Sequence, residues 1–144
     1  MSRQTGRVLA LDIGAKRTGL AISDASGTLA RPLGVIHGAN VLDAVLSRVE
    51  ALQAEDDGLG AIVVGHPRRL DGSPNDQTAH VVSLVAALRT RTSIPISLQD
   101  ERLSSVEAES RLALREKDWR RRKEKLDAAA AAIILQDFLD SRPA

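Results

Sequence analysis

Three carboxylates in this chain stand at the ends of segments that read as regular structure. Asp12 ends a short apolar run, Glu101 ends a later one, and Asp127 directly precedes a stretch of five alanines. In an open α/β sheet, ligands gather at the carboxyl ends of the parallel strands. Three acids gathered there would repel one another unless they held cations, and oxygen ligands suit hard divalent ions. The pattern predicts a site for two Mg²⁺ or Mn²⁺ ions that could hydrolyse a phosphodiester.

Each of these acids also has a purely structural explanation. Asp12 lies beside Gly14, so its carboxylate could satisfy backbone N–H groups in a turn. Glu101 could be a loop acid before a capped helix, and Asp127 could be a favourable charge in the first turn of the last helix. The alanines after Asp127 favour the catalytic interpretation, because they allow a helix backbone to approach a sheet closely.

The elements that must position these acids can be read from hydrophobic periodicity and turn residues. The first helix should bury Val41, Val45, Val49 and Leu52, and the second should bury Val81, Val82, Val85 and Leu88. The expected strands are 8–11, 19–22, 28–38, 61–67 and 94–101. Four helices are expected: the first is 40–53, with Asn40 as its N-cap, and the second contains Val81. The third begins at the capping box 104–107, and the last is 126–140.

This order predicts a mixed sheet between helical layers. The first three strands are joined by turns too short for a crossover helix, so they must be antiparallel, whereas the later strands alternate with helices and should be parallel. With 144 residues the chain is expected to form a single domain, 1–144. It has no cysteine, and neither a signal peptide nor an apolar run of membrane-spanning length is evident, so a soluble, cytoplasmic protein is expected.

Positive charge is concentrated in one segment, residues 115–125. This segment holds seven basic and three acidic residues, whereas the formal net charge of the whole chain is only +1. It also holds Trp119, the only tryptophan of the chain. A lone aromatic ring among cations can stack on an unpaired base while the cations hold phosphates. The alternatives are a solvated charged face and a ring that anchors a loop. The candidate nucleic-acid contacts here are Trp119, Arg120, Arg121, Arg122 and Lys123.

Four sequence blocks read, in order, DIGAKRTGLAISD, VVGHPRRLDGS, QDERLSS and KLDAAAAAIILQDFLD. Together they resemble the YqgF/RuvX family, which is assigned to Holliday junction resolution and to maturation of the 5′ end of pre-16S rRNA. The resemblance spans almost the whole chain. The resemblance implies a ribonuclease H-like fold with a five-stranded mixed sheet flanked by helices. It also implies that the acidic triad is Asp12, Glu101 and Asp127. Asp100 is the residue most easily confused with Glu101, but neighbouring strand residues face opposite ways.

The resemblance also implies a phosphate-binding loop, in which this chain departs from the usual pattern. The loop residues are Gly65, His66, Pro67, Asp71 and Gly72, and His66 stands where the family usually has an apolar residue. A structural or phosphate-contacting role is expected for His66. Further phosphate contacts, which position a strand without reading its sequence, are expected from Lys16, Arg17, Arg68, Arg69 and Arg102.

The expected function is therefore that of a metal-dependent endonuclease acting on pre-16S rRNA. The alternatives are a resolvase of four-way DNA junctions and a non-catalytic nucleic-acid-binding domain for ribosome assembly, in contact with ribosomal particles. A sugar-kinase or actin-like ATPase would need a second lobe, for which 144 residues leave no room. Aromatic residues that anchor interfaces are scarce, so a monomer or weak homodimer is expected.

Overall fold

The computed structural model describes residues 6–14, 16–38, 40–66, 76–100 and 119–142. The elements, in chain order, are β1 (Arg7–Ile13), β2 (Arg17–Ser23), β3 (Ala30–His37), α1 (Val41–Ala54), β4 (Leu59–His66), α2 (Asp76–Arg91), β5 (Ile96–Asp100) and α4 (Trp119–Ser141). This order confirms the predicted succession of strands and helices. The helix predicted from the capping box at 104–107 lies outside the described residues.

The five strands form one mixed sheet in the order β3-β2-β1-β4-β5. β2 is antiparallel to both β1 and β3, as the short connections require. β4 is parallel to β1 and β5, with helices serving as the crossovers. The predicted fold class, three antiparallel and then two parallel strands flanked by helices, is confirmed.

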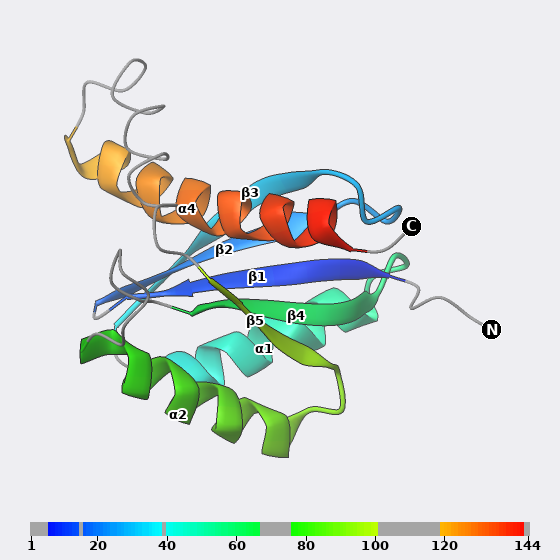
Figure 1. The fold of residues 1–144 in the computed structure, drawn as a ribbon, viewed down its shortest axis with the longest axis horizontal. Helices are drawn as coiled ribbons and strands as arrows, with labels where there is room; N and C mark the ends of the chain where they lie inside the picture. The colour runs from blue at the N-terminus through cyan, green and yellow to red at the C-terminus, as the bar shows by residue number, and fades with distance from the viewer. Residues whose placement is uncertain (1–5, 15, 39, 67–75, 101–118, 143–144) are drawn as a thin grey trace.

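Alternation along β1 directs its side chains into two separate apolar layers. Leu9, Leu11 and Ile13 belong to the larger core cluster with residues of α1 and α2, whereas Val8 and Ala10 pack in a second cluster with residues of α4. Figure 1 shows the corresponding layers, with α4 on one side of the sheet and α1 and α2 on the other. Because β1 is buried on both faces, it reads as a continuous apolar run rather than an alternating one.

The buried face of α1 is the predicted one, but that of α2 differs at one position. Val81, Val85 and Leu88 of α2 are buried, whereas Val82 is 46% exposed. Leu84 takes its place, because positions 81, 84, 85 and 88 follow the i, i+3, i+4, i+7 rule and position 82 lies about 100° from 81 around the helix.

α4 begins earlier than predicted. The second half of the basic segment forms its first turns, so Asp127 lies eight residues after Trp119 and not in the first turn. Asn40, in contrast, is at the predicted N-cap position of α1, although its side chain makes no capping hydrogen bond. In the described part of the chain, no helix has both the length and the apolar character that crossing a membrane requires.

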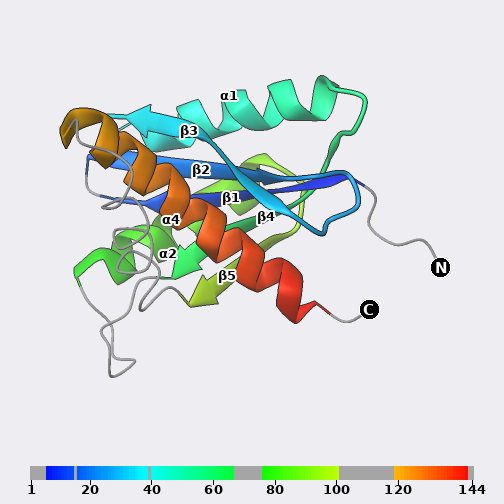
Figure 2. The same cartoon turned by 90° about the horizontal axis from the view of Figure 1, so that it is seen from above.

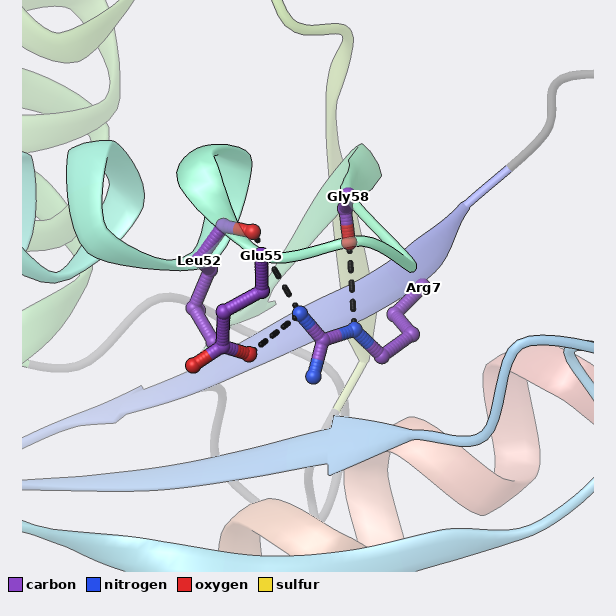
Figure 3. Close-up of polar contacts among 4 residues, drawn as sticks. All are labelled: Arg7, Leu52, Glu55 and Gly58. Carbon is purple, nitrogen blue, oxygen red and sulfur yellow. Dashed lines mark hydrogen bonds and ion pairs between the residues drawn. The ribbon is translucent and has the colours of Figure 1, made fainter.

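A buried arginine connects the start of β1 to the end of α1 (Figure 3). Arg7 donates from Nε to the carbonyl oxygen of Gly58 at 3.1 Å and from a terminal nitrogen to that of Leu52 at 3.3 Å. The same terminal nitrogen lies 2.7 Å from Glu55 Oε1. The guanidinium therefore adds a second hydrogen bond to a carbonyl of the last turn of α1, which also accepts the backbone N–H of Glu55 at 3.2 Å. This contact fixes the α1–β4 connection against the central strand.

At the edge of the sheet formed by β3, the β2–β3 hairpin is held by its own turn and by α4. Asp24 accepts the backbone N–H of Thr28 at 2.8 Å, and hydrogen bonds of this kind hold the pKa of Asp24 below its usual value. Gln136 of α4 receives the backbone N–H of Ala30 at 3.0 Å and donates to the carbonyl of Thr28 at 2.9 Å. One side-chain amide thus fixes the end of α4 to the hairpin.

The contact between α4 and β2 leaves no room for a side chain at Gly19. A Cβ atom added there would overlap the carbonyl group of Asp127 and lie 3.2 Å from the backbone nitrogen of Ala128. Figure 2 shows α4 running obliquely across the sheet. Glycine inside a strand often marks such a close approach of another backbone.

We expect Gly19→Ala to destabilise the protein by about 3 kcal/mol, because α4 must move to admit the methyl group, and to lower Tm by roughly 10 °C in a thermal melt. Gly34→Ala is the matched control, since a Cβ at Gly34 of β3 would have only the end of the Arg48 side chain as a neighbour, at 4.0 Å. Equal melting temperatures for the two variants would contradict the close contact at Gly19.

Candidate active site

Asp12 lies near the carboxyl end of β1, on the face of the sheet that α4 covers. It is directly opposite Gly19 in the antiparallel β1–β2 pair. Val8 and Ala10, which precede Asp12 by four and two residues, point into the cluster beneath α4. Side chains two residues apart in a strand share a face, so Asp12 is on the same face. The side chain is half-buried. The sheet therefore presents this acid to the underside of α4, as a strand-end acid of a site should be.

Asp127 reaches the same place from the other end of the chain. Its backbone carbonyl lies against Gly19, the residue opposite Asp12. Asp12 and Asp127, which are 115 positions apart in the sequence, are thus neighbours across a single glycine. The structure brings together two of the three predicted acids.

An arginine accompanies this pair of acids. Arg17 donates from Nε to Asp127 Oδ2 at 2.5 Å, and the two side chains are 30% and 24% exposed. Arg17 precedes the strand expected at 19–22, but it is the first residue of β2 and lies opposite His37 of β3. Its position two residues before Gly19 places it on the same face of the sheet.

The third predicted acid, Glu101, lies outside the described residues, directly after β5. The last described residue of β5 is Asp100, which is opposite His66 of β4. Asp100 is four residues after Ile96 and so shares its face of β5, and Ile96 belongs to the cluster on the α1 and α2 side of the sheet. Asp100 is therefore on the other face from Asp12, in keeping with the expectation that it is not the triad residue.

The predicted nucleic-acid contacts are described only in part. Lys16 is exposed beside Arg17. The backbone of residues 119–123 forms the first turns of α4, upstream of Asp127 on the same helix. The positions of Arg68, Arg69 and Arg102, and the side chains of Trp119, Arg120, Arg121, Arg122 and Lys123, lie outside what the structure describes, so these assignments stay predictions.

The two acids are suited to a divalent cation, because both are carboxylates whose backbones lie next to Gly19 between β1 and α4. Hard ions such as Mg²⁺ and Mn²⁺ prefer an all-oxygen ligand set of this kind. Within the described residues, no group of three His, Cys, Asp or Glu side chains forms a complete metal site. The residues present fit such an ion, and Asp12 and Asp127 are candidates for two of its ligands.

Two contributors to the site were missed by reading the sequence. Gly19 was assigned to a strand, yet a glycine inside a strand is itself a signal of close backbone approach. The Arg17–Asp127 ion pair has no such signal, because its partners are 110 positions apart.

A groove of about 510 Å³ between β3 and the first half of α4 was also not predicted from the sequence. Its lining residues include Pro32, Val35, His37, Lys125 and Ala129.

Comparison with known proteins identifies the family of this chain. The model of the RuvX family, described as Holliday junction resolvase, matches residues 6–141. A protein of Roseiflexus sp. (strain RS-1) named "Putative pre-16S rRNA nuclease" is 41% identical over 142 residues, which cover 99% of each chain. A protein of the same name from Thiobacillus denitrificans (strain ATCC 25259 / T1) is 42% identical over 137 residues, covering 95% of this chain and 93% of its own.

A solved structure supports the fold. T. thermophilus RuvC in complex with Holliday junction substrate aligns over 94% of both chains with a TM-score of 0.50 and 15% sequence identity. At this identity the likeness concerns the fold alone, and it agrees with the ribonuclease H-like architecture that was predicted. The family match over nearly the whole chain is the stronger finding: this protein belongs to the RuvX family.

Proposed function

We propose that this protein is a metal-dependent phosphodiester endonuclease that processes the 5′ end of pre-16S rRNA. The observation that carries the proposal is the meeting of Asp12 and Asp127 across Gly19, on the face of the sheet beneath α4. The names of its relatives supply the substrate class, since several proteins about 40% identical to this one are named for pre-16S rRNA. A cytoplasmic location follows from that substrate.

In this proposal Asp12, Glu101 and Asp127 hold two Mg²⁺ or Mn²⁺ ions. Bound ions of this kind activate a water molecule and stabilise the leaving oxygen of a phosphodiester. The chain supplies the geometry: β1 fixes Asp12, α4 fixes Asp127, and Glu101 follows the carboxyl end of β5, two strands away from β1 in the sheet. Because each acid comes from a different element, the fold as a whole sets the spacing of the ligands.

The cations bind the substrate strand in this mechanism. Lys16 and Arg17 contact phosphates next to the acids, and Arg68, Arg69 and Arg102, which follow β4 and β5 in the sequence, extend this contact. The start of α4 contributes a second region, where Trp119 stacks on an unpaired base. Such contacts hold a single strand without selecting its sequence. The cations of this second region are Arg120, Arg121, Arg122 and Lys123.

A resolvase of four-way DNA junctions is the second candidate, favoured by the description of the family. A third candidate is a non-catalytic binding domain for ribosome assembly. A cleavage assay with a precursor-rRNA fragment, single-stranded DNA and a four-way DNA junction, each with Mg²⁺ or Mn²⁺, separates the first two. A binding domain would instead cut nothing and would bind nucleic acid equally well in EDTA.

We expect Asp12→Asn, Glu101→Gln and Asp127→Asn each to abolish cleavage, because each removes a ligand charge with little change of shape. A loss of several kcal/mol of transition-state stabilisation corresponds to roughly a thousandfold or more in rate. Melting temperatures of Asp12→Asn and Glu101→Gln should not fall, since repulsion between the acids is relieved, whereas Asp127→Asn also loses its ion pair with Arg17 and should melt slightly lower. Asp100→Asn is the control and should cut normally, as Asp100 is on the opposite face. Cleavage by purified Asp12→Asn at a rate comparable to wild type would refute the two-metal proposal.

Replacing Arg120, Arg121 and Arg122 together with Gln should weaken nucleic-acid binding for every sequence tested. The log–log salt dependence of the affinity should flatten by roughly one unit for each lost phosphate contact. Arg48→Gln serves as control, because this exposed arginine lies on α1, across the sheet from α4. An unchanged slope in the triple variant would mean that these cations form only a solvated face.

Sedimentation equilibrium at micromolar protein should show a monomer, or at most a weak dimer, in the absence of nucleic acid. Trimming one RNA strand needs a single active site, whereas symmetrical cutting of a junction needs two at a fixed separation. A tight dimer with both sites on the same side would overturn the preference for RNA and make the resolvase the leading function.

A further inference from the structure

The ion pair between Arg17 and Asp127 is less exposed to solvent than a typical surface ion pair. Its two side chains are only 30% and 24% exposed, and Nε lies 2.5 Å from Oδ2. Gly19 holds the backbone of Asp127 directly against β2, and Arg17 is two residues away on the same strand face. The backbones of both partners are held close together and both side chains are largely buried, so solvent screens this pair less than it screens most exposed ion pairs.

The carboxylate that Arg17 holds is one of the proposed ion ligands. A guanidinium and a divalent cation are alternative partners for the same oxygens. If both were held there, their like charges would lie a few ångströms apart in a partly buried place, where repulsion is much stronger than in water. The guanidinium therefore opposes ion binding as long as it stays on Asp127.

We propose that Arg17 is a positioning residue whose guanidinium changes its anionic partner. It pairs with Asp127 when no divalent ion is bound, and it pairs with a phosphate of the substrate strand when the ions are bound. This inference rests on the proposed function, because it takes Asp127 as an ion ligand. In the free protein Arg17 neutralises one of two adjacent acids and so keeps the site assembled. In the loaded protein its charge serves the nucleic acid.

Linkage makes the exchange measurable. If ion binding releases Arg17 to the substrate, then substrate binding must raise the affinity for ions by the same factor by which ions raise the affinity for substrate. Removing the charge of Arg17 should uncouple the two. The ion should then bind more tightly in the absence of nucleic acid, while nucleic acid should gain less from the presence of the ion.

The test is a titration of the protein with Mn²⁺ in the absence of nucleic acid, followed by calorimetry or by the electron paramagnetic resonance of the free ion. Arg17→Gln keeps an N–H donor for Asp127 and should fold normally, but lacks the charge. We expect it to bind Mn²⁺ more tightly by roughly five- to tenfold. Arg17→Lys, which restores the charge, should return the affinity toward that of wild type.

Arg48→Gln is the matched control for this titration, since it removes an equal charge from an exposed side chain on α1, to which no role in the site is assigned. Solvent and salt screen that charge, so the Mn²⁺ affinity should change by less than about twofold. An equal gain in Arg48→Gln and Arg17→Gln would overturn the exchange, because the effect would then be one of general charge. A wild-type Mn²⁺ affinity in Arg17→Gln would overturn it as well.

Asp127→Asn separates this inference from the proposed function. If Asp127→Asn loses Mn²⁺ binding while Arg17→Gln binds as wild type does, the exchange is wrong and the metal site stands. If Asp127→Asn binds Mn²⁺ as well as wild type does, both proposals are wrong. A second readout is the fluorescence anisotropy of a labelled single-stranded RNA, in which Arg17→Gln should weaken binding with Mn²⁺ present and change it little in EDTA.

Discussion

The contact between the backbone of α4 and Gly19 of β2 is the constraint on which the proposed site depends. It fixes the distance between a helix and a sheet that are also joined by an apolar cluster, by the Arg17–Asp127 ion pair and by the hydrogen bond of Gln136 to Ala30. Asp12 is opposite this glycine, and Asp127 lies against it. The small side chains of 128–132 serve the same contact, because the helix can settle on the sheet only where its own residues are short. Any larger residue at Gly19 would push α4 away from β2 and so separate Asp127 from Asp12, although neither acid would itself be changed.

Other contacts hold the frame around this point without entering the site. Arg7 fixes the start of β1 to the end of α1 on one side of the sheet. Gln136 fixes the end of α4 to the β2–β3 hairpin on the other. Both anchors lie at the end of the sheet where β1 begins, whereas Asp12 lies at the opposite end, where β1 finishes. The end of the sheet far from the site is therefore stabilised by residues to which no catalytic role is assigned.

Sequence reasoning was reliable where one physical rule decided the outcome. Short connections forced the antiparallel strands, helical crossovers forced the parallel ones, and the face of α1 followed its periodicity. It failed at Val82, where a continuous apolar pair concealed the helical period, and at the start of α4, where a charged segment gave no apolar signal of a helix. The pairing of Arg17 with Asp127 could not be read from the sequence, because it depends on where α4 docks on β2.

The position of Asp127 in the last described helix has a consequence for the timing of folding during synthesis. The sheet and the layer formed by α1 and α2 are encoded before α4, so they can form while the ribosome is still translating. Until α4 emerges, the face carrying Val8, Ala10 and Val63 lacks the residues of α4 that pack on it, and the two acids have not met. Docking of α4 then buries these side chains and brings Asp127 to Asp12 in the same event, so the pair of acids cannot assemble before the sheet is covered.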